Sequence, residues 1–316
     1  MSSPAPASDA IPGKLFDFQV NGFGGVDFQD ERISAADLGR ALAALRRHRV
    51  ARFFVTLITD DVDRLCRRLE RLEQLRAADP AAAHMIAGYH LEGPWLSPLP
   101  GYCGAHPPDH MHAPSIAEFE RLQTAAGGRI RLVTLAPECP GSDAFIRHLT
   151  GRGVHVSIGH TNASDADIDR AIAAGARFCT HLGNGAPLQL PRHDNVIQRL
   201  LARDELIACF IPDGVHLPPF VLRNFFRAKP AGRALFTTDA MAGAGAPGGR
   251  YRLGAMAIDI GADRIARPPG GEGFAGSTLA PDEGVRRVAE WLGLPLAEAV
   301  RLWSAAPAAA FGIALG

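Results

Sequence analysis

Short apolar runs, each followed by a polar turn and an amphipathic stretch, recur along most of this 316-residue chain. The apolar runs cover residues 15–23, 52–59, 85–93, 130–138, 154–162, 177–184, 206–216 and 234–243. The stretches between them repeat apolar residues with the period of a helix, and several open with Ser or Asp at an N-cap position. Eight strands alternating with helices indicate a parallel sheet, and eight is the number that closes a (β/α)8 TIM-type barrel. We therefore predict an α/β fold of that type.

The segment after the eighth run breaks this alternation. Residues 249–273 predict a β-hairpin insert followed by a Gly/Pro-rich loop, and two helices, near 278–293 and 295–310, close the chain. We expect residues 1–11 to form a flexible N-terminus and residues 12–316 to form a single barrel domain.

Composition narrows the classes of partner. The hydrophobic content of 47% suits a globular protein with a substantial core, and 33 basic residues balance 33 acidic ones. This balance offers no electrostatic reason to expect nucleic acid or an anionic membrane as a partner. Five scattered cysteines without a C-x-x-C pair indicate reduced thiols. The N-terminal residues lack the features of a signal peptide, and no apolar run approaches the ~20 residues that span a bilayer, so we expect a cytoplasmic protein.

Polar residues occupy the ends of the predicted strands. Glu92, His160, His181, His216 and Asp239 each lie at or just past the C-terminal end of a different apolar run. In an eight-stranded α/β barrel these ends converge on one face, where the active site is built. Any one of them alone is more often a structural residue, but five such coincidences favour a common site.

The residue types at these positions indicate metal-assisted hydrolysis. Two neutral imidazoles and one carboxylate are the ligands of a catalytic zinc that keeps a fourth position for water. Such a metal lowers the pKa of bound water to about 7 and polarises a carbonyl oxygen. A further carboxylate, Asp239, is suited to take the proton of the water and return it to a leaving amine. His90 lies two residues before Glu92, on the same side of its strand, and is expected to support the site rather than bind the metal.

Two other patterns are set aside. The sequence "GAGAPG" (243–248) matches a dinucleotide-binding pattern in letters but does not open a helix, so we interpret it as a loop. No apolar run ends in Lys, which disfavours Schiff-base chemistry and a carboxylated-lysine site with two metals.

Taken together, the motifs resemble those of one family. "HLEGPW", "GAH", "TLAPE", "IGHTNA", "THLGNGAP", "PDGVH", "TTDAMAGAG" and "GSTLAPDEGV" occur in the order found in the N-acetylglucosamine-6-phosphate deacetylase family of the amidohydrolase superfamily. The resemblance runs from about Pro12 to Ile313. It implies a metal-dependent hydrolase barrel.

The resemblance also implies the roles of individual residues. Glu92, His160 and His181 are expected to bind one divalent metal, with zinc as the expected ion. Asp239 matches the general base and acid of the family, and His106, in "GAH", matches a histidine that helps hold and polarise the substrate. The residues expected to bind the substrate are His106, Asn184, Gly185, Arg192, His216, Ala275, Gly276 and Ser277. Within this set His216 is expected to contact the sugar, the Asn184 turn and Arg192 the phosphate, and the 274–278 loop the acetyl end.

The chain departs from the family pattern at three places. Gln19 and Asn21 stand where many amidohydrolases carry H-x-H, and because amides are poor zinc ligands, no second metal is expected there. Gly183 and Gly185 replace bulkier residues at the presumed phosphate subsite. The small β-sandwich of the family is also expected to be missing from this chain.

The expected reaction is removal of the N-acetyl group of N-acetylglucosamine 6-phosphate, giving glucosamine 6-phosphate and acetate. Two alternatives stay open: a deacetylase of another N-acetyl amino sugar (galactosamine 6-phosphate or an unphosphorylated sugar), or a non-catalytic sugar-phosphate binder. The complete set of metal ligands and general base argues against the binder. The resemblance further suggests a homodimer with a small-molecule amino-sugar phosphate as its ligand.

Overall fold

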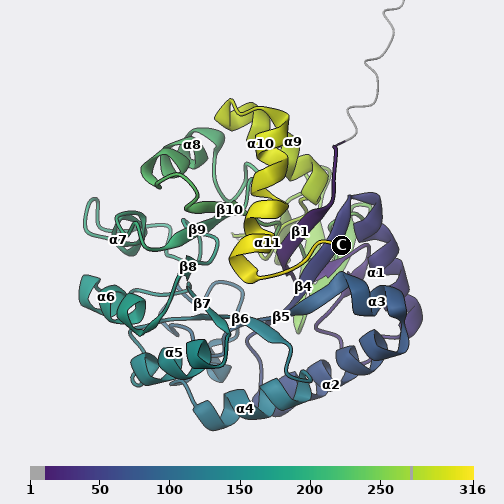
Figure 1. Cartoon of the computed structure of the whole chain (residues 1–316), viewed down its shortest axis with the longest axis horizontal. Coiled ribbons are helices and arrows are strands. Elements are labelled where there is room, and N and C mark those ends of the chain that lie inside the picture. The colour runs from purple at the N-terminus through teal and green to yellow at the C-terminus, as the bar shows by residue number, and fades with distance from the viewer. Residues whose placement is uncertain (1–10, 271–272) are drawn as a thin grey trace, which may run out of the picture.

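The structure, a computed structural model, describes residues 11–270 and 273–316 (Figure 1). Eight parallel strands form one sheet in chain order. They are β1 (Leu15–Val20), β4 (Val50–Ile58), β5 (Ile86–Glu92), β6 (Ile130–Leu135), β7 (His155–Ile158), β8 (Phe178–Cys179), β9 (Ile207–Phe210) and β10 (Ala234–Phe236). Each of the eight predicted runs overlaps one of these strands. The predicted TIM-type barrel is confirmed.

The first strand meets the segment that follows the last one, and this contact brings the sheet close to closure. Val20 and Ala240 form a parallel bridge, and the backbone N–H of Asn21 donates to the Ala240 carbonyl at 2.7 Å. Beneath them the buried Asp17 carboxylate accepts hydrogen bonds from the Thr237 and Thr238 hydroxyls. The loop after β10 is thereby held against the end of β1.

Helices surround the strands (Figure 1). They are α1 (Ala35–Arg47), α2 (Val62–Ala78), α3 (Pro80–Met85), α4 (Ile116–Ala125), α5 (Ser142–Gly151), α6 (Asp165–Ala174), α7 (Val196–Leu201), α8 (Pro219–Ala228), α9 (Pro281–Leu292), α10 (Leu296–Leu302) and α11 (Ala305–Phe311), with a 3-10 turn, η1 (Pro108–His110). Ser34 and Ser164 cap α1 and α6 as expected, each in a capping box. The short helices α3 and α7 were not predicted. No helix among the described residues is long and apolar enough to cross a bilayer.

The predicted helix at 295–310 is wrong as one element, because the chain forms α10 and α11 instead. Pro307 explains the break. It has no N–H to donate to the carbonyl of Trp303, four residues earlier, and a proline ring collides with that carbonyl in a continuous helix. The Trp303 carbonyl accepts from the backbone N–H of Phe16 at 3.0 Å instead. The break therefore ties the C-terminal helices to β1.

The insert after β10 contains the predicted hairpin, β11 (Gly249–Leu253) with β12 (Met256–Ile260), and a third antiparallel strand, β13 (Ala266–Arg267), that was not predicted. Leu253, Ile258 and Ile260 pack in one apolar cluster with Ile58 and Met241, which fixes the insert over the barrel. The remaining described strands, β2 (Gly22–Phe23) and β3 (Val26–Asp27), pair with each other, so the described residues build no β-sandwich.

The predicted flexible N-terminus falls largely outside the described residues, because only Ile11 of its span is described, and Ile11 is buried. The division into residues 1–11 and a single domain from 12 to 316 stays a prediction.

Candidate active site

The carboxyl ends of the barrel strands bring the candidate residues together. Glu92 is the last residue of β5, His160 and His181 follow β7 and β8 by two residues, and Asp239 follows β10 by three. They line one cavity of about 470 Å³, part of it open to solvent. Its other lining residues are Asn21, Ile58, Gly104, Ala105, His106, Asn184, His216, Leu253, Phe274 and Gly276.

The backbone is unusual at three of these positions. His160, His181 and Asp239 have φ angles of 50°, 28° and 51°, and among the described residues only Arg49 and Arg264 are further non-glycine residues with positive φ. Such conformations are disfavoured for residues with a Cβ and concentrate at functional sites. They turn the three side chains into the mouth of the barrel.

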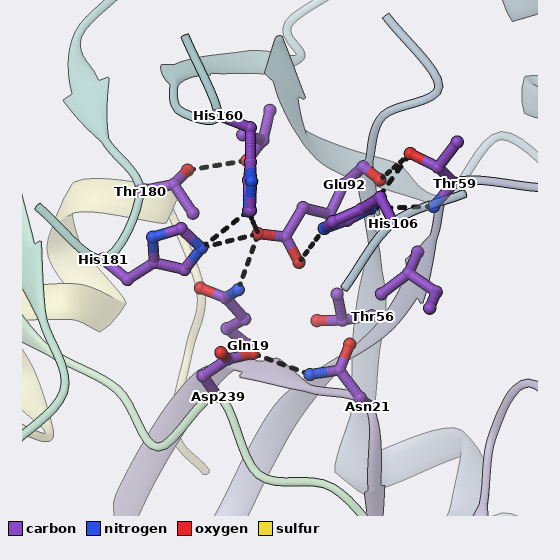
Figure 2. Close-up of polar contacts among 12 residues, drawn as sticks. Gln19, Asn21, Thr56, Thr59, Glu92, His106, His160, Thr180, His181 and Asp239 are labelled. Atoms are coloured by element: carbon purple, nitrogen blue, oxygen red, sulfur yellow. Dashed lines mark hydrogen bonds and ion pairs between the residues drawn. The ribbon is translucent and has the colours of Figure 1, made fainter. Parts of the chain in front are cut away.

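Three donor atoms of Glu92, His160 and His181 converge (Figure 2). Glu92 Oε1 lies 2.9 Å from His181 Nε2 and 3.3 Å from His160 Nε2, and the two nitrogens are 3.1 Å apart. The ligand atoms of a tetrahedral zinc, at bond lengths of 2.0–2.2 Å, are about 3.4 Å from one another. The three donor atoms are slightly closer together than that, so small outward movements of the side chains would make room for a divalent ion. His160 Nδ1 donates to the Tyr102 carbonyl at 2.8 Å, which leaves the lone pair of Nε2 facing the site. The donor set and its spacing fit a divalent metal.

Glu92 is ionised in this setting. Burial raises the pKa of the Glu92 carboxyl, but the neighbouring imidazoles of His160, His181 and His106 together outweigh burial and hold that pKa well below its usual value. Gln19 adds a hydrogen bond from Nε2 to Glu92 Oε1 at 3.2 Å. A charged carboxylate at the centre of the histidines is the form that binds a cation.

His106 lies next to the same group, and the ligand atoms of Glu92, His106 and His160 are all within 4.8 Å of one another. His106 Nε2 is 3.8 Å from Glu92 Oε2, farther than either distance from Glu92 Oε1 to the other two histidines. His106 Nδ1 lies 3.3 Å from the backbone nitrogen of Thr59 and 3.0 Å from the Thr59 hydroxyl. Because a backbone N–H can only donate, we assign the lone pair to Nδ1 and the ring proton to Nε2. Burial lowers the pKa of His106 to about 3, so the ring is neutral. These contacts favour His181 as the third ligand and His106 as a hydrogen-bond donor.

Asp239 is positioned as a proton carrier. Asn21 Nδ2 donates to Asp239 Oδ1 at 2.7 Å. Burial, assisted by the nearby Glu92 charge, raises the pKa of Asp239 to about 7. A carboxylate with a pKa near neutrality both accepts and returns a proton readily.

The remaining predicted site residues divide into those that reach the cavity and those that do not. His216 lines it, with Nδ1 2.6 Å from Asp213 Oδ2; burial lowers the pKa of His216, but the Asp213 charge outweighs burial and raises it overall. Asn184 and Gly276 also line the cavity, whereas Gly185 packs against the His160 ring. Arg192 is exposed and is not among the described lining residues.

Ala275 and Ser277 lie behind the cavity wall. Ser277 N–H donates to the Asp239 carbonyl at 2.9 Å, and Ser277 Oγ donates to the Thr238 carbonyl at 2.6 Å. This pair of bonds supports the loop that carries Asp239. The sequence did not single out the apolar lining residues Ile58 and Leu253, because nothing in their local pattern distinguishes them from core residues. Phe274 lies in the expected 274–278 loop, and Asp213 lies in the motif "PDGVH", but neither was given a role of its own.

Comparison with known proteins places this geometry in a family. No protein-family model matches the chain. The chain is 32% identical over 289 residues to N-acetylglucosamine-6-phosphate deacetylase from Bacillus subtilis, an alignment that spans 91% of this chain and 72% of that enzyme. The chain belongs to the N-acetylglucosamine-6-phosphate deacetylase family.

Two further relatives of this deacetylase family bear on the site. A mutant of N-acetyl-D-glucosamine-6-phosphate deacetylase from Mycobacterium smegmatis, solved in complex with N-acetyl-D-glucosamine-6-phosphate, matches with a TM-score of 0.86 and 33% identity, over 99% of this chain and 82% of that one. N-acetylgalactosamine-6-phosphate deacetylase from Escherichia coli O157:H7 is 32% identical over 94% of this chain and 77% of that enzyme. The predicted resemblance and the enzyme class, a metal-dependent amidohydrolase, are confirmed.

A substitution at Gly104 tests how tightly the His160 ring is packed. Gly104 has φ 56°, and a Cβ placed there would lie 2.9 Å from Cε1 of the His160 ring. We expect Gly104→Ala to displace the His160 ring and to weaken the binding of a divalent metal about tenfold, the lower end of the effect of disturbing groups that orient a metal ligand. The measurement is a zinc titration against a competing chelator.

Gly128→Ala is the matched control, because Gly128 has φ 75° and no atom of a described residue lies within 4 Å of an added Cβ. Equal zinc affinity in the two variants would show that the His160 ring has room to move.

Proposed function

We propose that this protein hydrolyses the N-acetyl group of N-acetylglucosamine 6-phosphate, giving glucosamine 6-phosphate and acetate. The observation that carries the proposal is the convergence of Glu92, His160 and His181 to within 3.3 Å beside the buried Asp239. The names of the relatives support the same substrate.

We propose Glu92, His160 and His181 as the ligands of one divalent metal, with zinc as the expected ion. When bound there, the metal supplies a Lewis acid that polarises the acetyl carbonyl and lowers the pKa of a water. The remaining catalytic work falls to side chains of the chain.

Asp239 is proposed to transfer the protons, and His106 is proposed to stabilise the negative charge that develops on the carbonyl oxygen. Asp239 takes a proton from the attacking water while the water oxygen bonds to the carbonyl carbon. His106 Nε2–H donates to the carbonyl oxygen as negative charge develops on it. The carbon–nitrogen bond then breaks as Asp239 returns its proton to the nitrogen. The products are the free amine and acetic acid, which loses its remaining proton to solvent and leaves as acetate.

The substrate is proposed to lie between the metal ligands and the outer wall of the cavity. The sugar would contact His216, the phosphate would meet Asn184, Gly185 and Arg192, and the acetyl end would lie near Ala275, Gly276 and Ser277. A guanidinium suits a phosphate because its N–H groups match two phosphate oxygens at once. Because Arg192 is exposed, it can bind the phosphate only if the substrate reaches out of the cavity to the 185–195 segment or that segment moves toward the substrate. The homodimer and the cytoplasmic location stay predictions.

A second candidate substrate is N-acetylgalactosamine 6-phosphate. An enzyme named for that sugar is as similar in sequence to this chain as the Bacillus subtilis relative, at 32% identity. The two sugars differ only in the configuration at C4. This carbon is not part of the acetamide group on which the reaction takes place.

Acetate release from four sugars tests both candidates. The zinc-loaded full chain is assayed with N-acetylglucosamine and N-acetylgalactosamine, each with and without the 6-phosphate. We expect the highest kcat/KM for N-acetylglucosamine 6-phosphate. A preference for the galactosamine phosphate would select the second candidate, and saturable binding without acetate release would select the non-catalytic binder.

A further inference from the structure

Asn21 occupies a central place beside the candidate base. It is 2% exposed, lines the cavity and directly follows β1. Its backbone N–H donates to the Ala240 carbonyl at 2.7 Å, and its side-chain nitrogen donates to Asp239 Oδ1, also at 2.7 Å. Two bonds therefore fix Asn21 to the segment that carries the base.

The orientation of the Asn21 amide follows from its neighbour. Turned the other way, the amide would set its oxygen against a carboxylate oxygen of Asp239, so the nitrogen must face Asp239 and the oxygen must face away (Figure 2). That oxygen, Oδ1, is buried and has no hydrogen-bond partner among residues 11–270 and 273–316. A buried acceptor without a donor is unfavourable, and because Asn21 lines the cavity, a group bound there can supply the missing donor.

The proposed reaction supplies such a donor. The scissile nitrogen receives its proton from Asp239, so it must come within hydrogen-bond distance of that carboxylate and hence beside Asn21. The nitrogen lone pair has to point to Asp239 as the carbon–nitrogen bond breaks. The N–H that the nitrogen already carries then points elsewhere and needs an acceptor.

We propose that Asn21 is a catalytic residue whose Oδ1 accepts the N–H of the scissile amide and so turns the nitrogen lone pair toward Asp239. The inference rests on the proposed function. It also accounts for the pair of amides on β1: Gln19 donates to Glu92 Oε1 and orients a metal ligand, whereas Asn21 orients the base and the leaving nitrogen. Asn21 thus has a role that does not depend on metal binding.

A comparison of amide and ester substrates separates this role from a structural one. N-Acetylglucosamine 6-phosphate and its ester analogue, 2-O-acetylglucose 6-phosphate, are assayed with wild-type enzyme and with Asn21→Leu, Asn21→Ala and Asn21→Asp, after subtraction of enzyme-free hydrolysis. The ester oxygen carries no hydrogen, so it has nothing to donate to Asn21. We expect Asn21→Leu and Asn21→Ala to lower the amide-to-ester ratio of kcat/KM about ten- to hundredfold, the loss expected for one buried hydrogen bond.

Asn21→Asp is the matched variant, because it keeps the acceptor oxygen and loses the donor to Asp239. It should lower both rates and leave the ratio within about threefold of wild type. Zinc content and melting temperature are measured for every variant, and the alanine variant serves if the leucine variant does not fold. An unchanged ratio in the folded leucine or alanine variant would overturn the inference, whereas wild-type enzyme inactive on both substrates would overturn the proposed function instead.

Discussion

The Asp239→Asn variant is expected to lose about a thousandfold or more in kcat for acetate release while it keeps its bound zinc. Asparagine has almost the same shape as aspartate but cannot take a proton from water or return one to the leaving nitrogen. General acid–base groups contribute roughly 10²–10⁴-fold to rate, and here one carboxylate serves both steps. Initial rates at saturating substrate and the zinc content of each preparation are the measurements.

Asp165→Asn is the matched control, since Asp165 is exposed at the start of α6, pairs with Arg203 and is not among the described residues that line the cavity. Near-normal turnover in Asp239→Asn would remove Asp239 from the proposed chemistry. Loss of zinc together with turnover would show instead that Asp239 helps to hold the metal.

Metal removal is the second large effect. Treatment with a chelator is expected to reduce acetate release to under about 1% of its starting rate, and one equivalent of zinc should restore it, because neutral water is a poor nucleophile without a Lewis acid. The melting temperature should also fall on chelation. A ligand that binds only the folded state stabilises it by about 4 kcal/mol at a concentration a thousand times its Kd.

Chelator mixed with excess zinc is the control for effects of the chelator itself. Full activity in protein with no bound metal would contradict the assignment of Glu92, His160 and His181 as ligands. Adding other divalent ions to the metal-free protein, one at a time, identifies which of them supports acetate release.

Most strands and helices of the barrel could be predicted from the local pattern of apolar and polar residues. Strand runs and helical stretches alternate because a parallel sheet buried on both faces needs apolar strands and covering helices, and both leave local periodicities. Failures came where a distant partner decides the outcome. The strand β13 forms because β12 is there to pair with it, and the Trp303 carbonyl, left without a helical donor by Pro307, accepts from the distant N–H of Phe16.

By itself, the sequence determined the fold class and the members of the reactive group. Glu92, His160, His181 and Asp239 stand at strand ends, and barrel closure brings strand ends together whatever lies between them. Only the tertiary structure decided how these residues divide the work. Asn21 and Asp239 are 218 positions apart, and their hydrogen bond, like the unpartnered Oδ1 beside it, exists only because the loop after β10 closes against β1. Such distances and orientations depend on packing of the whole chain, which local sequence does not record.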